Sequence, residues 1–532
     1  MTLRRTARTP RTEPPPRTAD ARLDAARRGR ELATLDSGEA GRVDLVVVGG
    51  GVTGAGIALD AASRGLRTVL LEARDLAFGT SRWSSKLAHG GLRYLATGNV
   101  GIARRSAVER GRLLSTTAPH LTRPLAQVVP VFTDTPAVGA VLPRLGFVAG
   151  DALARLAGTP TSALPRARTV GAAEVERLVP GVRHRGLRAG HVNWDCQLVD
   201  DARLVTALAR TAAAHGATVL TRCRVDAADG RNVEFTDTLD GSAHRLSARA
   251  VVNATGVWAA GLDEEIAVRP SRGTHLVVDA ARVGNPTGAL TVPVPGSVNR
   301  FCFVLPQDFG RVYVGLTDID APGPVPDEPR ATQEEVDFLL DVVGAALQVP
   351  LTRDDVLASF SGLRPLVDTG DGETADLSRE HCIRADANGL LTVTGGKLTE
   401  YRLMAEQVVD RVVADSGAPA GPCRTTHLPL VGAPRPGDGG PAGAGAGLPA
   451  SLVRRFGAEA GEVLAASLLD RPLEPVAPGL DVTRAEFSFH VTHEGALDVS
   501  DVLDRRSRVG LVPGDRAAAE PCAREALAAA GL

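Results

Sequence analysis

Lysine and tyrosine are scarce in this chain of 532 residues. Of the 60 basic residues only two, Lys86 and Lys397, are lysines, and tyrosine occurs three times. Arginine carries a planar, permanently charged guanidinium group, which does not replace the compact ammonium of lysine in a tight site. Chance survival under a codon bias is one explanation for the two lysines. Both fall inside the motifs described below, which favours a functional role.

Paired cysteines, long apolar runs and an excess of either charge are also missing. The six cysteines are scattered with no CxxC spacing, which argues against a disulfide framework and against a zinc site, so we expect no metal. No run of about 18 apolar residues occurs, which excludes a confident membrane-spanning helix. Lys+Arg number 60 and Asp+Glu number 62, so the chain has no net positive charge that would attract nucleic acid. We expect a soluble cytoplasmic protein.

The composition changes along the chain in a way that predicts its domains. Residues 1–42 form a basic, proline-containing tail that we expect to be disordered, with a short helix over residues 24–33 and a weak electrostatic hold on a membrane as alternatives. A strand–turn–helix pattern then runs over residues 43–430. Residues 431–450 are mostly Gly, Pro and Ala, which is typical of a linker. Helical patterns occupy residues 451–532.

A nucleotide-binding signature opens the folded part of the chain. The aliphatic run Val43–Val48 predicts a buried parallel strand, and Gly49, Gly51 and Gly54 follow it with GxGxxG spacing at the start of a predicted helix. The glycines allow a tight turn, close approach of a pyrophosphate, and close helix–strand packing. Glu72 ends the next strand, 23 positions after the first glycine, where it would bind the adenosine ribose.

Later segments are predicted to contact the same ligand. Two of them are strands that run into turns of small residues, ending at Asn253 and Thr394. The second turn starts a helix, whose N-terminus would stabilise negative charge at the pyrimidine end of a reduced flavin. The predicted cofactor contacts, besides Gly49, Gly51, Gly54 and Glu72, are Ser81, Ser84, Ser85, Lys86, Val225, Thr255, Gly256, Gly395, Gly396, Lys397, Leu398 and Thr399.

These segments resemble a known family. Val48–Gly65, Thr80–Leu95, Asp200–Leu204 and Gly395–Ala405 are similar to the FAD-dependent glycerol-3-phosphate dehydrogenases of the respiratory, aerobic type. Phe360–Pro365 matches as well, and the resemblance extends from about residue 43 to residue 510. The tail and the Ala/Gly linker depart from the family pattern. So does Trp83, which stands where small polar residues are usual.

The resemblance implies a specific reaction. A base would remove the proton of the C2 hydroxyl of glycerol 3-phosphate while the C2 hydride passes to FAD, giving dihydroxyacetone phosphate. A membrane quinone would accept the electrons through peripheral attachment to the inner face of the cell membrane. A homodimer is compatible with this reading, and no nucleic acid is expected as a partner.

Cations for the substrate phosphate stand inside the matching segments. Arg93, Arg364 and Lys397 are predicted to clamp the phosphate or the alkoxide, because arginine binds phosphate as a bidentate fork and lysine as a point charge. Tyr94 is predicted to hydrogen-bond the substrate. For each arginine an ordinary surface salt bridge is the alternative.

Two histidines are candidates for the base, since histidine titrates nearest to neutral pH. His89 lies beside two glycines that would let the flavin ring approach, and His275 precedes an aliphatic strand. A structural role is the alternative for both. In a third reading Arg364 stabilises the alkoxide and lowers the pKa of the C2 alcohol.

The expected fold class is α/β. A Rossmann-like FAD-binding domain would be interleaved with an α+β substrate domain, roughly residues 100–190 and 265–365, built on a mixed or antiparallel sheet, and a C-terminal helical domain would follow the linker. Three other functions stay open: a glycerol-3-phosphate oxidase that uses oxygen, an amine or amino-acid oxidase of related fold, and a flavoprotein without enzymatic activity.

Overall fold

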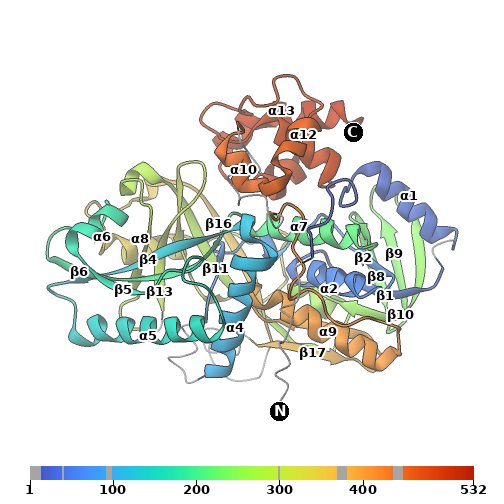
Figure 1. The fold of residues 1–532 in the computed structure, drawn as a ribbon, viewed down its shortest axis with the longest axis horizontal. Helices are drawn as coiled ribbons and strands as arrows, with labels where there is room; N and C mark the ends of the chain where they lie inside the picture. Colours follow the sequence, from blue (N-terminus) through green and yellow to red (C-terminus); the bar gives the residue numbers. More distant parts are fainter. Residues whose placement is uncertain (1–12, 39–40, 92–98, 298–299, 368–379, 435–446) are drawn as a thin grey trace, which may run out of the picture.

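The protein consists of two sheet-based lobes joined side by side, with a helical domain above their junction (Figure 1). This arrangement is that of a computed structural model. It describes residues 13–38, 41–91, 99–297, 300–367, 380–434 and 447–532.

The first lobe is built on an eight-stranded sheet whose centre is parallel. Its main path runs β17-β18-β10-β1-β2-β7, and β8 and β9 extend it through β10. Strand β1 pairs in parallel with both β2 and β10, as its continuous aliphatic run predicts. The strands are β1 (Val43–Val48), β2 (Thr68–Leu71), β7 (Thr218–Leu220), β8 (Cys223–Ala228), β9 (Asn232–Asp237), β10 (Ala243–Asn253), β17 (His381–Ala385) and β18 (Leu391–Gly395).

Helices rich in small residues cover this sheet. Helix α2 (Val52–Ser63) is buried along most of its length because it lies against the strands, α7 (Asp201–Ala214) and α9 (Tyr401–Ser416). Asp200 begins α7 as its N-cap and accepts a hydrogen bond from the backbone N–H of Arg203 at 3.1 Å. The acidic pair at this position therefore starts a helix.

The second lobe is built on a ten-stranded sheet that is antiparallel except where β12 pairs with β4. Its apolar core lies between the strands and α8 (Gln333–Gly344). Helices α5 (Ala137–Leu156) and α6 (Ala172–Leu178) lie at its outer side (Figure 1). The strands are β3 (Leu87–Ala88), β4 (Thr122–Phe132), β5 (Arg168–Gly171), β6 (Leu187–Leu198), β11 (Val268–Asp279), β12 (Ala289–Pro293), β13 (Phe301–Pro306), β14 (Arg311–Gly315), β15 (Ile319–Asp320) and β16 (Val356–Val367).

The C-terminal helices form a third unit with its own apolar core. They are α10 (Ala450–Phe456), α11 (Ala460–Ala465), α12 (Arg484–His493) and α13 (Pro513–Ala529). Buried ion pairs connect this unit to the first lobe: Arg203 donates to Glu494 at 3.0 Å, and Arg210 donates to Glu459 at 2.8 Å. The predicted fold class, a Rossmann-like domain with a mixed-sheet domain and a helical C-terminus, is confirmed.

The alternative of a short helix over residues 24–33 is confirmed, so the expectation of a disordered tail is wrong over residues 25–36. Helix α1 (Ala25–Asp36) begins at Asp24, which accepts from the N–H of Arg27 at 2.6 Å. The chain before the helix is held by the C-terminal domain, where the N–H of Leu23 donates to the carbonyl oxygen of His493 at 3.0 Å. Local polarity suggested an unfolded arm, but these long-range contacts order it.

Candidate active site

At Gly49 in the loop between β1 and α2, and at Gly54 in the first turn of α2, only glycine fits. At Gly49 the backbone φ is +107°, and a Cβ atom would lie 2.7 Å from the carbonyl oxygen of Ala254. At Gly54 a Cβ atom would lie 1.9 Å from the carbonyl oxygen of Gly49. The glycines therefore bring α2 against β1 and β10, and this is the backbone geometry that lets a pyrophosphate reach the N-terminus of a helix.

Glu72 and Ser81 border this loop. Glu72 accepts a hydrogen bond from the N–H of Gly50 at 2.6 Å, and Ser81 accepts one from the N–H of Val52 at 2.9 Å. Burial raises the pKa of Glu72, against the opposing effect of the backbone N–H donors of Arg74 and Gly50. Both side chains therefore lie where the sequence predicts contacts with the ribose and the diphosphate.

Three glycine-containing turns meet at one edge of the first sheet. Strands β1, β10 and β18 are parallel neighbours, so their carboxyl ends lie together. Thr255 follows β10, and its hydroxyl donates to Asn253 at 2.7 Å. Gly395 ends β18 and Gly396 follows it, each with φ of +78°. Because a ligand of an open parallel sheet binds beyond the carboxyl ends of its strands, this edge fits a dinucleotide.

Buried polar contacts hold the segment before β3, which contains Ser84 and Lys86. Lys86 donates to the carbonyl oxygen of Arg82 at 2.8 Å and forms an ion pair with Asp201 at the start of α7. Ser84 donates its N–H to Asp201 at 2.9 Å. The Lys86 ammonium is therefore bound within the protein. Its predicted contact with the cofactor, like that of Ser84, stays a prediction.

Val225 lies on β8, next to the strand end that carries Glu72. The N–H of Cys223, two residues earlier, donates to the carbonyl oxygen of Glu72 at 2.8 Å. Val225 is thus near the predicted adenosine end of the site, and its contact with the cofactor stays a prediction.

His89 is oriented by a buried carboxylate. Its Nδ1 lies 3.1 Å from Oδ2 of Asp195, and the other oxygen of Asp195 accepts from Arg110 at 2.8 Å. Burial would raise the pKa of Asp195, but Arg110 and His89 lower it on balance. A charged Asp195 accepts a hydrogen bond from the Nδ1–H of His89, so Nε2 carries the lone pair. The His89 side chain is 47% exposed, which lets a substrate reach it.

His275 has a different environment. It is 2% exposed, its Nε2 lies 2.8 Å from the hydroxyl of Ser85, and its ring stacks on Phe360 with centroids 4.8 Å apart. Burial, together with the charges of Arg364 and Lys86, lowers the pKa of His275 to about 3. A histidine with so low a pKa is a weak proton acceptor at neutral pH, so the environment favours His89 as the base.

Two of the three predicted cations, Arg364 and Lys397, have polar partners from other elements. Arg364 on β16 donates to Asp318 at 3.1 Å. Lys397, two residues after the end of β18, donates to Ser106 on α4 (Val100–Arg112) at 3.1 Å and to Glu400 at 3.3 Å. Such partners hold long side chains in place before a substrate binds.

The structure brings most of the motifs together. Thr80 donates to the carbonyl oxygen of Leu363 at 2.6 Å, which places the serine-containing segment on β16. A Cβ atom at Gly395 would lie 3.6 Å from the carbonyl oxygen of Pro365, so the β16 and β18 motifs are neighbours. Arg93 and Tyr94 lie outside the described residues, and their predicted roles stay predictions.

Sequence reasoning missed the residues that orient the candidates. Asp195, Arg110, Ser106 and Asp318 carry no local signature. Each is distant in sequence from the side chain that it contacts. No motif spacing could have identified them.

Comparisons with known proteins agree with this geometry. The chain matches the family described as FAD dependent oxidoreductase over residues 44–402, and the C-terminal domain of alpha-glycerophosphate oxidase over residues 423–530. The chain therefore belongs to the FAD-dependent oxidoreductases, and FAD is its cofactor. The glycine loop and Glu72 fit that cofactor, because the loop leaves no side chain between the N-terminus of α2 and a diphosphate, and Glu72 supplies a carboxylate for a ribose.

Individual relatives indicate which branch of this family the chain belongs to. Glycerol-3-phosphate dehydrogenase 1 of Mycobacterium tuberculosis is 56% identical over 512 residues, covering 95% of this chain and 98% of the relative. The D-erythritol 1-phosphate dehydrogenase of Brucella abortus is 38% identical, and the match covers 69% of this chain and 73% of the relative. The crystal structure of the glycerol-3-phosphate dehydrogenase of Bacillus halodurans with FAD has a TM-score of 0.71 at 28% identity, covering 95% and 94%. The chain is a member of the FAD-dependent glycerol-3-phosphate dehydrogenase family.

Proposed function

We propose that this protein oxidises sn-glycerol 3-phosphate to dihydroxyacetone phosphate and passes the electrons to a membrane quinone. The names of the relatives support the substrate. The observation that carries the proposal is the combination of a carboxylate-oriented histidine, His89, with two cations, Arg364 and Lys397, on motifs that border the FAD edge. FAD supplies the acceptor for the C2 hydride.

The residues of the chain handle charge and protons. Arg364 and Lys397 bind the dianionic phosphate or the developing alkoxide, together with Arg93 and Tyr94 of the matching segment. Nε2 of His89 takes the proton of the C2 hydroxyl, and Asp195 stabilises the imidazolium that results. Loss of one proton and one hydride converts the secondary alcohol to a ketone, so the step releases two electrons in all.

A peripheral membrane contact through α5 is part of this proposal. Val141, Leu145 and Val148 project from α5 at helical spacing and are 54%, 61% and 58% exposed. Arg144 and Arg155 are exposed on the same helix, which suits an anionic membrane surface. Within the part of the chain that the structure describes, no helix is long and apolar enough to cross a bilayer.

The substrate assignment is tested by flavin absorbance. The purified FAD-loaded protein is mixed with glycerol 3-phosphate without oxygen, and we expect the oxidised-flavin band near about 450 nm to bleach. Glycerol, an amino acid and erythritol 1-phosphate are the control compounds. Bleaching by an amino acid but not by glycerol 3-phosphate would overturn the assignment and favour the amino-acid oxidase.

The electron acceptor is tested separately. After anaerobic reduction, a soluble quinone should restore the colour much faster than air does. Rapid recovery in air with slow recovery by quinone would identify an oxidase instead.

The membrane contact has its own assay. In flotation with vesicles that contain anionic lipid, Leu145→Glu should lower the bound fraction. Leu239→Glu, which changes a leucine that is 57% exposed elsewhere, should not. Equal binding of wild type and Leu145→Glu would remove α5 from the proposal.

A further inference from the structure

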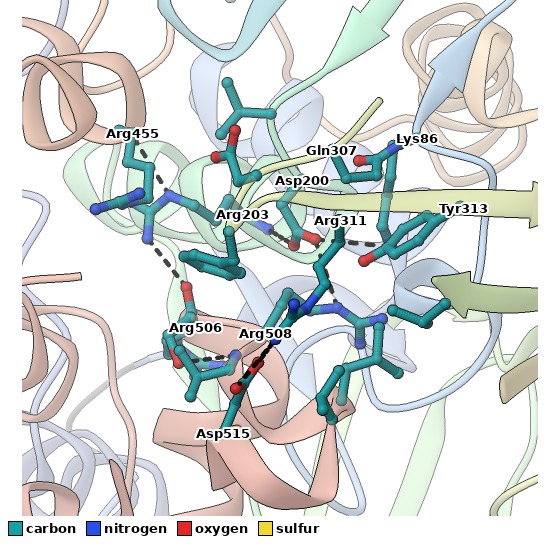
Figure 2. A pocket seen from close by; sticks show the side chains of 18 residues that line it. Lys86, Asp200, Arg203, Gln307, Arg311, Tyr313, Arg455, Arg506, Arg508 and Asp515 are labelled. Carbon is teal, nitrogen blue, oxygen red and sulfur yellow. Dashed lines mark hydrogen bonds and ion pairs between the residues drawn. The ribbon is translucent and has the colours of Figure 1, made fainter. Parts of the chain in front are cut away.

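The two lysines of the chain have different surroundings. Lys86 is 1% exposed and lies at a small cavity, where it pairs with Asp200 at 3.6 Å and with Asp201 (Figure 2). The side chain of Lys397 is 17% exposed and forms an ion pair with Glu400 at 3.3 Å. The charge of Lys86 is therefore compensated inside the protein. Lys397 reaches the surface of its site, and the groups behind it decide how much positive charge a ligand meets there.

Lys397 is held by a serine and a carboxylate that also contact each other. Its Nζ atom donates to Oγ of Ser106 at 3.1 Å and to Oε1 of Glu400 at 3.3 Å. The hydroxyl of Ser106 donates to the same oxygen of Glu400 at 2.5 Å. Ser106 is fully buried and Glu400 is 2% exposed. Because the Ser106 proton is bound to Glu400, the Ser106 oxygen accepts from Lys397, and the three groups form one fixed cluster.

The cluster stands at the carboxyl edge of the first sheet. Lys397 follows the end of β18 by two residues, and Glu400 ends the short turn that leads into α9. Helix α4 lies against this turn and supplies Ser106. The two helices are joined a second time, because Glu109 on α4 accepts from Arg402 on α9 at 2.6 Å. The position of α4 thus does not depend on the Ser106 contact alone.

The order of the strands indicates which end of FAD faces this cluster. Glu72 follows β2, the glycine loop follows β1, and the sheet continues over β10 to β18. Neighbouring strands are about 4.8 Å apart. A dinucleotide with its ribose at Glu72 and its diphosphate at the glycine loop would therefore extend across β10 towards β18. This direction brings the flavin end of FAD to the turn that carries Lys397.

The charge of a flavin changes when it is reduced. Uptake of two electrons and one proton leaves one negative charge on the pyrimidine side of the ring, so protein charges nearby alter the reduction potential. An ammonium group favours the reduced form, and a carboxylate opposes it. We propose that Glu400, positioned by Ser106, balances the charge of Lys397 and thereby lowers the reduction potential of the bound FAD. A lower potential makes the reduced flavin a stronger electron donor to its acceptor.

The test is a reductive titration of the FAD-loaded protein with dithionite and a redox dye, which measures the potential without substrate. Glu400→Gln keeps the size of the side chain and an oxygen that accepts hydrogen bonds, but it removes the charge. At a given potential we expect the ratio of reduced to oxidised flavin to rise about tenfold, which is about 30 mV for a two-electron couple. Lys397→Gln should shift the potential in the opposite direction. The double variant removes both charges and should return close to the wild-type value.

Two control variants separate the charge of the cluster from general effects on folding. Glu406→Gln makes the same substitution further along α9, at a carboxylate that accepts from Arg402 at 2.7 Å, and should keep the wild-type potential. Ser106→Ala changes no charge, so its shift should be smaller than that of Glu400→Gln.

A wild-type potential in Glu400→Gln would overturn the proposal, and so would equal shifts in Glu400→Gln and Glu406→Gln. If Glu400→Gln does not retain FAD, the Lys397→Gln variant decides, and an unchanged potential in that variant overturns the proposal. The assay needs no turnover, so its result is independent of the proposed reaction.

Discussion

Asp75 joins the C-terminal domain to the nucleotide-binding lobe by charge, and its neutralisation should separate them. The residue follows β2 and is fully buried. Its carboxylate accepts from Arg505 at 2.6 Å and from both terminal nitrogens of Arg506 at 2.8 Å. Asp75→Asn keeps the size of the side chain but removes its charge, which leaves two buried guanidinium groups with a poorer partner.

The expected loss in the free energy of unfolding follows from this geometry. Breaking a buried ion pair by removing one partner costs about 3–5 kcal/mol, because the remaining charge is left without compensation. The Asp327–Arg74 pair provides the comparison, since both of its side chains are more than half exposed. For Asp327→Asn we expect a loss of about 0–1 kcal/mol.

The pH dependence has a defined sign. Burial would raise the pKa of Asp75, but Arg506 and Arg505 lower it below its usual value. A carboxyl group whose pKa is lowered by folding stabilises the protein above its unfolded pKa, and this contribution is lost as the pH falls through the folded pKa. The difference between wild type and Asp75→Asn should be full at neutral pH and should shrink below about pH 4.

Urea unfolding followed by circular dichroism measures the loss of stability, and limited trypsin digestion reports release of the C-terminal domain. We expect earlier unfolding and faster release for Asp75→Asn, and little change for Asp327→Asn. If both variants unfold at the wild-type urea concentration at pH 7, the buried carboxylate does not hold the domains together and the reasoning is refuted.

Three further changes test the active site. Asp195→Asn should lower kcat by about 10²–10⁴-fold, because the amide no longer orients His89 in the required tautomer; unchanged steady-state kinetics would exclude the pair from proton transfer. Lys397→Ala should lower kcat/KM by about 10–100-fold through loss of one charge-assisted contact, and wild-type kinetics would instead fit a flavoprotein without this activity. Gly54→Ala should release FAD on gel filtration, since the added Cβ would meet Gly49; full flavin retention would contradict that contact.

The cofactor site was predictable because its signals are local. The strand, the glycines at 49, 51 and 54, and the helix that follows are contiguous, and Glu72 is one βαβ unit away. The spacing of such residues is fixed by the geometry of the turn itself. The segments at Thr255 and Gly395 followed the same logic, and the parallel pairing of β1, β10 and β18 then placed them at one edge.

The tail and the lysines show where local signals fail. A polar N-terminal segment predicts disorder by composition, yet contacts with the C-terminal domain hold Leu23. Lys86 stands inside a motif, yet its ammonium pairs with Asp201, which lies 115 positions away. The ordering of a segment depends on surfaces that it meets only after folding, and these are not written in its own composition.

The sequence by itself determined the class of fold, the cofactor loop and the set of chemically suitable side chains, because periodicity and turn geometry are short-range properties. Only the tertiary structure decided which candidate base is oriented for proton transfer and which is kept uncharged. His89 meets a charged Asp195, whereas His275 is buried near cations, and both burial and these charges lower its pKa. It also brought Ser106 to Glu400, which lies 294 positions further along the chain. Burial and partner distance set protonation and charge balance, and both arise only when distant segments pack together.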